Sequence, residues 1–312
     1  PLGVMVVAMV LVFTQPSPHI RSRVDYLGGL LITSSLVALT LGLARIVDAD
    51  VQMAGYFVAF AATLALFILR QRAVGEHAII PPRLFKSRAF AAANGTHLLV
   101  GAALIIVMIS LPLMANTALG LTPLDGGLLL MRMTAALAVG AIAGGFACRN
   151  FDVRLPAALG LALAIAGFFL MSEWTFNIKD PIQTIHLTIV GFGFGLLISP
   201  VTLAATESVG EENRGVAAAT IMSTRMMGMT LGIAALTAWG TDRFQDLVSG
   251  IAIPFTIAGH TGHEVQNQEF DTQLRSAGMI LFNEFFVIAM VVCLVALIPV
   301  AFMSWDRFRT RD

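Results

Sequence analysis

The sequence predicts an all-α, polytopic membrane protein, and three observations carry this prediction. Hydrophobic residues make up 57% of the 312 positions and charged residues only 12%, whereas a soluble domain carries roughly 25% charge. Long apolar runs recur along the chain, and the basic residues gather between alternate runs. A chain of this composition cannot cover its surface with polar groups, so we expect lipid to surround it.

The apolar runs predict about eight full transmembrane helices and a partial first one. A spanning helix needs about 20 apolar residues, because each residue adds about 1.5 Å. The run at 1–13 would cover only about 20 Å of a roughly 30 Å hydrocarbon core. The eight full spans are predicted at about 25–47, 52–70, 90–114, 124–147, 153–174, 184–206, 215–239 and 278–303.

The loop charges predict the orientation of these spans. When the end of the first run is placed in the cytoplasm, thirteen of the 19 Lys and Arg residues fall in cytoplasmic segments and four fall outside. The remaining two, Arg132 and Arg225, lie inside predicted helices. By the positive-inside rule, this bias predicts a multi-pass protein of the cell (inner or plasma) membrane with a cytoplasmic C-terminus.

Two connections between the spans are long. Residues 71–89 form a basic cytoplasmic linker with a Pro-Pro break, which is the best internal boundary of the chain. Residues 240–277 are predicted to form a polar extracytoplasmic loop, in which "TDRFQDLVSGI" is expected to lie as a short helix at the membrane interface.

Small residues recur at a spacing of four within three spans, and this spacing lets helix backbones approach closely. Two prolines, Pro112 and Pro200, also fall inside predicted helices, where each removes a backbone hydrogen bond. The small-residue pairs are Gly140 and Gly144, Gly191 and Gly195, and Gly228 and Gly232.

Three charged residues within spans are candidates for a substrate or proton pathway, since a charge at a helix centre costs roughly 2.5–3.5 kcal/mol on insertion scales. Arg225 lies near mid-membrane, where it either faces a cavity and binds an anionic or protonatable group, or is a structural arginine tied to backbone carbonyls. Arg132 lies nearer the outer face and either lines the pathway or extends to the interface. Glu284 either carries a proton, pairs with Arg132 or lies at the membrane interface.

Further polar residues complete the set of candidates. Asn94 and Asn116 are candidates for lining the pathway, and His97 is expected to be a hydrogen-bonded core histidine rather than a proton relay. Glu207 and Arg214 are candidates for a cytoplasmic gate pair, since they flank one short loop.

Several function classes find no support in the sequence. Its formal net charge of zero argues against nucleic-acid binding, which needs a concentrated basic surface. None of the nucleotide-binding, metalloprotease or serine-hydrolase fingerprints is present, so we expect neither an enzyme nor a bound cofactor or metal. Cys148 and Cys293 are expected to be small, inert core residues.

Four stretches of the chain carry a resemblance to a known family. They are "VDYLGGLLITSSLVALTLGL" (24–43), "PPRLFKSRAF" (81–90), "LPLMANTALGLTPLDGGLLLM" (111–131) and "NRGVAAATIMSTRMMGMTLGIA" (213–234). In sequence and in their order along the chain, they resemble the fourteen-span drug:proton antiporters of the major facilitator superfamily, the EmrB/QacA-like group.

This resemblance implies a major facilitator type helical bundle, of which the chain would hold the C-terminal portion. Residues 1–13 would end the N-terminal half, 14–70 would hold two extra central helices, 71–89 the cytoplasmic linker, and 90–312 a six-helix bundle. The implied partners are the lipid bilayer, a small-molecule substrate, protons, and an N-terminal six-helix bundle absent from this chain.

The cytoplasmic loop motif of that group departs from its usual pattern in "GFACRNFDVR" (145–154). Gly145 and Arg154 fit the motif, whereas Arg149 and Asn150 replace its Asp-Arg pair and Asp152 replaces a glycine. A charge latch through Arg149, Asp152 and Arg154 is the form that the motif would take here.

The function implied by the resemblance is proton-coupled efflux of lipophilic or cationic drugs and other small molecules, by alternating access. One bundle alone has no opposite wall for its cavity, so the isolated chain is expected to insert without transporting. The alternatives are a facilitator of a small solute and a non-transporting or degenerate membrane protein, such as a scaffold or receptor.

Overall fold

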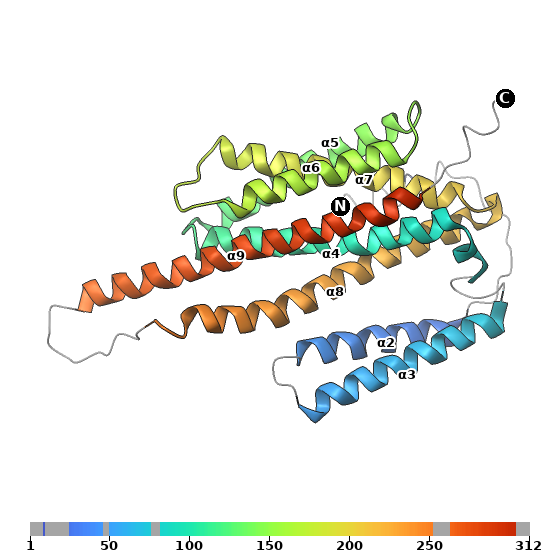
Figure 1. The fold of residues 1–312 in the computed structure, drawn as a ribbon, viewed down its shortest axis with the longest axis horizontal. Coiled ribbons are helices and arrows are strands. Elements are labelled where there is room, and N and C mark those ends of the chain that lie inside the picture. Colours follow the sequence, from blue (N-terminus) through green and yellow to red (C-terminus); the bar gives the residue numbers. More distant parts are fainter. Residues whose placement is uncertain (1–8, 10–24, 46–49, 76–81, 252–262, 304–312) are drawn as a thin grey trace.

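The computed structural model describes residue 9 and residues 25–45, 50–75, 82–251 and 263–303 (Figure 1). The predicted partial helix at 1–13, apart from Met9, and the C-terminal end of the chain lie outside these residues. Within them the protein is all-α, which confirms the predicted fold class. Eight helices are long and apolar enough to cross a membrane. They are α2 (Tyr26–Ala44), α3 (Val51–Val74), α4 (Arg88–Thr117), α5 (Pro123–Ala147), α6 (Arg154–Ser172), α7 (Ile182–Glu207), α8 (Arg214–Val248) and α9 (His263–Phe302).

Local capping signals set the starts of several helices. The Asp25 and Asp50 carboxylates accept hydrogen bonds from the third backbone N–H that follows each of them, at the starts of α2 and α3. At the start of α5, Thr122 and Asp125 form a reciprocal capping box, with Pro123 in the first turn. These side chains satisfy N–H groups that a helix start leaves without partners.

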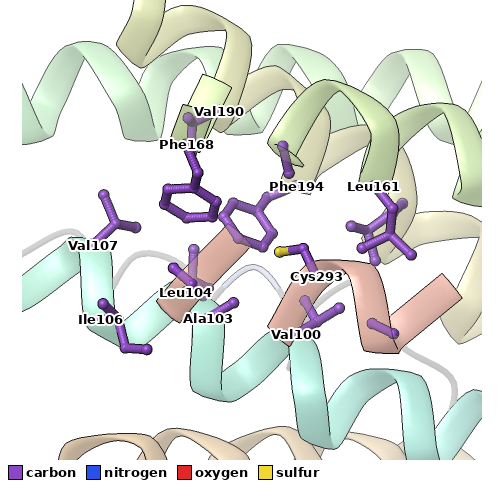
Figure 2. Packing of buried hydrophobic residues seen from close by; sticks show 14 of the residues in the cluster. Val100, Ala103, Leu104, Ile106, Val107, Leu161, Phe168, Val190, Phe194 and Cys293 are labelled. Atoms are coloured by element: carbon purple, nitrogen blue, oxygen red, sulfur yellow. The ribbon is translucent and has the colours of Figure 1, made fainter. Parts of the chain in front are cut away.

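Helix α4 lies at the centre of the bundle and packs against α5, α7, α8 and α9. The helices α2 and α3 form a hairpin that contacts the bundle mainly through α8 (Figure 1). Figure 2 shows the core where α4, α6, α7 and α9 meet, with the rings of Phe168 and Phe194 5.8 Å apart between their centroids and Cys293 beside them. Phe168, Phe194 and Cys293 are fully buried.

The predicted glycine pairs lie at close helix contacts. On α5, a Cβ at Gly144 would lie 2.5 Å from the Leu196 carbonyl oxygen of α7. On α7, a Cβ at Gly195 would lie 2.0 Å from the Leu137 carbonyl oxygen of α5. The two helices therefore use reciprocal glycines to bring their backbones together. Pro112 and Pro200 lie inside α4 and α7, as predicted.

The prediction for residues 240–277 is wrong in part. Residues 240–248 continue α8 without interruption, and α9 already begins at His263, so much of this segment belongs to two long helices. In Figure 1 the start of α9 extends well beyond the ends of α5–α7. Phe244 and Leu247 pack against the core, and this contact gives the extension of α8 an apolar side that favours helix over loop.

A short 3₁₀ helix, η2 (Pro82–Lys86), precedes α4 within the predicted linker. A second, η3 (Glu211–Asn213), precedes α8. The guanidinium Nη2 of Arg83 in η2 donates to the side-chain oxygen of Asn213 in η3, 3.4 Å away. This contact places the starts of α4 and α8 at the same end of the bundle, in agreement with the alternation that the loop charges predict.

Candidate functional site

A buried polar group joins α4 to α8. The Thr224 hydroxyl of α8 donates to the Asn94 side-chain oxygen of α4 across 2.9 Å, and the Asn94 amide donates to the Phe90 carbonyl one turn earlier, also across 2.9 Å. His97, one turn further along α4, is only 1% exposed. Neither of its ring nitrogens forms a well-aligned hydrogen bond with the described residues, although the Ile198 carbonyl of α7 lies nearby.

Arg225 follows Thr224 and is half-buried. Its backbone carbonyl lies against α4, because a Cβ on Gly101 would approach that oxygen to 2.3 Å. Its guanidinium Nη2 contacts the Met222 sulfur at 2.8 Å. Arg225 forms no ion pair within the described part of the chain, so its charge stays available to a group from elsewhere.

Beyond Arg225, α4, α8 and α9 enclose an apolar groove of about 400 Å³. Gly228 and Gly232 of α8 form one wall, and Trp239 lies at its outer end. Gly228 also meets α4 so closely that a Cβ there would lie 1.9 Å from the Leu98 carbonyl oxygen. None of the described residues that line the groove is charged. Its lining residues are Leu98, Leu99, Ala102, Ile106, Gly228, Leu231, Gly232, Ala235, Leu236, Trp239, Ile288 and Val292.

A second cavity of about 440 Å³ lies further along the same three helices, where α8 and α9 extend outward. Phe244, Leu274 and Phe282 give it apolar walls, whereas Asp271 and Arg275 line it with charge. Between the two cavities the Phe285 ring packs against Gly240, where a Cβ would lie 2.7 Å from the ring. Gly240 and Phe285 line neither cavity, and along α8 and α9 they lie between the residues that line the groove and those that line the outer cavity.

The candidates Arg132 and Glu284 lie in separate ion pairs towards the outer end. The Arg132 Nη1 lies 2.8 Å from each carboxylate oxygen of Asp180, in the loop before α7. Glu284 instead accepts two hydrogen bonds from Arg243, at 2.9 and 2.6 Å. The alternative in which Glu284 pairs with Arg132 is therefore wrong, because each residue has a partner on a nearer segment. Their roles in a pathway stay predictions.

Hydrogen bonds from Thr184 and then from Arg132 lower the pKa of Asp180, which lies outside the spans. Asn116 lies exposed near the end of α4, apart from the polar group around Asn94. The structure thus brings Asn94 and Arg225 into one region, and it leaves Arg132, Glu284 and Asn116 in others.

At the other end of the bundle, the predicted pair between Glu207 and Arg214 is present, with the Arg214 Nη2 3.3 Å from a Glu207 oxygen. Arg214 also lies 3.5 Å from Glu211. These contacts bridge the turn between α7 and α8, so the ion pair stabilises this turn. Its role as a gate stays a prediction.

The loop motif at 145–154 does not form the expected latch. No ion pair joins Arg149, Asp152 and Arg154 among the described residues. Asp152 accepts from the Arg154 backbone N–H at 3.0 Å, and the Arg154 side chain donates to the Met303 carbonyl at the end of α9. Arg149 lies over the Phe146 ring, 4.8 Å from its centroid, and Gly145 is exposed. The motif therefore anchors α6 to α9.

Sequence reasoning missed the partners Thr224, Asp180 and Arg243. Thr224 lies 130 residues from Asn94 and Asp180 lies 48 from Arg132, so no local spacing connects either pair. Arg243 lay in a segment that was predicted as a separate short helix within a loop, whereas it belongs to α8. The signal that could have found it is the apolar periodicity of residues 236, 240, 244 and 247, which continues α8 at helical spacing.

These helices and their contacts define a polytopic membrane protein with the major facilitator fold. A solved bacterial homologue of the human lysosomal transporter Spinster, in an inward-facing and occupied conformation, matches it with a TM-score of 0.52. The match covers 90% of this chain and 70% of that chain at 15% identity. At this identity the likeness is one of fold.

Two curated relatives are triacylglyceride transporters. The protein of Mycolicibacterium hassiacum is 30% identical over 323 residues, which cover 96% of this chain and 60% of the relative. The protein of Mycolicibacterium smegmatis is 31% identical over 312 residues, which cover 93% of this chain and 55% of the relative. The chain thus spans little more than half the length of these relatives. No protein-family model matches it. The relatives are named as transporters, in agreement with the prediction that the chain is not an enzyme.

Proposed function

We propose that the protein acts as a membrane transporter of lipophilic molecules, with acylglycerol lipids as the favoured substrate class. The observation that carries this proposal is the groove of about 400 Å³ among α4, α8 and α9, where no described lining residue is charged. An uncharged apolar groove within membrane-spanning helices suits an acyl chain, because the chain would leave no charged or polar group of the groove without a partner. The names of the relatives favour the same class.

In this proposal, transport proceeds by alternating access between two bundles, of which α4–α9 supply one. Arg225 would face the shared interior and bind an anionic or protonatable group of the opposite bundle. Its half-buried position and its lack of an ion pair among the described residues support this role. The cell membrane, with the C-terminus in the cytoplasm, is the proposed location.

The second candidate is proton-coupled efflux of lipophilic or cationic drugs. The motif resemblance in residues 24–43, 111–131 and 213–234 favours it. A cationic substrate needs a carboxylate or aromatic faces to replace its water. Among the cavities of the described residues, the outer one offers Asp271, but beside the cation Arg275. The local charge therefore favours a neutral lipid over a cation.

The test reconstitutes the protein, in the form that the cell makes, into liposomes with a fluorescent triacylglycerol. Transfer out of the loaded leaflet is followed by quenching, with and without a pH gradient, and ethidium serves as the cationic probe. We expect lipid transfer that Arg225→Ala reduces and that Lys179→Ala, which removes an exposed cation of the α6–α7 loop, leaves unchanged.

Ethidium export driven by the pH gradient, without lipid transfer, would replace the first candidate by the second. If liposomes with the protein move neither the triacylglycerol nor ethidium faster than empty liposomes, the result would contradict transport and favour a scaffold or receptor.

A further inference from the structure

Three basic side chains line one pocket between the end of α3 and the 3₁₀ helix η2. The pocket has a volume of about 340 Å³ and contains no carboxylate among its described lining residues. Its cations are Arg72 from the last turn of α3 and Arg83 and Lys86 from η2. Gln71, Gly75 and Pro82 complete the lining.

The neighbouring charges leave this pocket positive. The Asp25 carboxylate at the start of α2 lies beside Gln71, but it already accepts hydrogen bonds from the Arg70 side chain and from the Gly28 N–H. Arg72 and Lys86 are exposed and form no ion pair with the described residues. The C-terminus of α3 contributes only about half a negative charge, which the two cations Arg72 and Lys86 outweigh.

The pocket lies where α3 leaves the hydrocarbon. The apolar run of α3 ends at Leu69, and Arg70 and Arg72 follow at once, which is the usual position of basic side chains at the headgroup level. Gly75, which ends α3 with a φ of 63°, has no atom near its missing Cβ. Access to the pocket on that side is therefore open among the described residues.

We propose that this pocket binds the phosphate headgroup of an anionic phospholipid from the adjoining leaflet. Arg and Lys donate charge-assisted hydrogen bonds to phosphate oxygens, and basic pockets at helix ends on the basic side of membrane proteins suit acidic headgroups. The acyl chains of such a lipid lie along the apolar surface of α3, whose Leu66 and Leu69 are exposed.

The position of the pocket gives the lipid a structural role. The α2–α3 hairpin contacts the bundle mainly through α8, whereas the pocket joins the last turn of α3 to the segment that leads into α4. A bound phosphate holds Arg72 together with Lys86 and so ties the hairpin to the bundle. This inference does not depend on the proposed transport function.

The experiment measures lipid retention by native mass spectrometry of the purified protein, loaded with phosphatidylglycerol or phosphatidylcholine in separate arms. We expect selective retention of phosphatidylglycerol. The double variant Arg72→Gln, Lys86→Gln should weaken it about 25-fold, since each cation near anionic lipid contributes about fivefold. Arg72→Lys keeps the charge and should retain the lipid.

A matched control removes two cations elsewhere, with Arg45→Gln and Lys179→Gln. Size-exclusion profiles of all variants should match, because the four substituted residues are at least partly exposed. Equal retention of both lipids, or retention that the double variant leaves unchanged, would overturn the proposal. Binding of inorganic phosphate without retention of phosphatidylglycerol would overturn it as well, in favour of a soluble phosphate ligand.

Discussion

Arg243 and Glu284 join α8 to α9 through a bidentate ion pair, with N–O distances of 2.9 and 2.6 Å. Next to it, the Phe285 ring packs on Gly240 and lies 5.8 Å, centroid to centroid, from the Trp239 ring. The charged and aromatic contacts therefore close the space between α8 and α9 at one level. The apolar groove lies on one side of this level and the amphipathic cavity on the other.

The ion pair should contribute modestly to stability. In a double-mutant cycle with Arg243→Gln and Glu284→Gln, we expect a small coupling free energy that favours the folded state, because both side chains are about one-third exposed and solvent screens the pair. Thermal unfolding in detergent at pH 7 measures it. A coupling near zero would mean that the two helices are held here by the aromatic contacts alone.

Adjacent glycines of α5 should respond in opposite ways to the same substitution. A Cβ at Gly144 would lie 2.5 Å from the Leu196 carbonyl oxygen, whereas a Cβ at Gly145 meets nothing within 4 Å. We expect Gly144→Ala to lower stability by about 1–3 kcal/mol through overpacking. Gly145→Ala should leave it unchanged or raise it, since alanine favours helix. Similar unfolding midpoints for the two variants would contradict the close α5–α7 contact.

Hydropathy predicted the bounds of the eight spans to within a few residues, except at the end of α8 and the start of α9. It failed for residues 240–248 and 263–277, because an apolar window detects the part of a helix in lipid and not its continuation into water. Of the candidate site, the pairing of Glu207 with Arg214 could be expected from the sequence, because one short loop separates them. The partners of Arg132, Glu284 and Asn94 could not, because tertiary packing selects them.

The pair between Arg132 and Asp180 should give a small, pH-dependent stabilisation. Hydrogen bonds from Thr184 and Arg132 lower the pKa of Asp180 below its ordinary 3.8. A group with a lowered folded pKa stabilises the fold above its unfolded pKa, and this contribution disappears as the pH falls through the folded pKa.

We therefore expect Asp180→Asn to reduce stability by at most about 1 kcal/mol near pH 6, since the Asp180 side chain is 51% exposed. The difference from the parent protein should shrink below pH 3.8. Unfolding curves of both proteins at several pH values measure it. Asp125→Asn, at an exposed helix start, provides a carboxylate control with a different partner. A difference that grows on acidification would contradict the assigned ion pair.

Cys148 should react slowly with thiol reagents in the folded protein. Burial, and then the nearby Asp152 carboxylate, raise the pKa of this thiol, and the residue is 4% exposed. Because the thiolate is the reactive form, both effects slow alkylation near pH 7. Maleimide labelling followed by mass spectrometry should find little modification before denaturation and two labels afterwards, one on each of the two cysteines. Rapid labelling of Cys148 in the native protein would contradict its burial at the start of the α5–α6 loop.

Helix α8 contains 35 residues without a proline, so it is about 52 Å long and resists bending between its ends. Arg225 lies in its first half and Phe244 near its far end. A rigid tilt of about 10° about the Arg214 end would displace Val248 by about 9 Å, several times the shift at Arg225. A small movement at the half-buried Arg225 is thus coupled to a displacement about three times larger at the far end of the same helix.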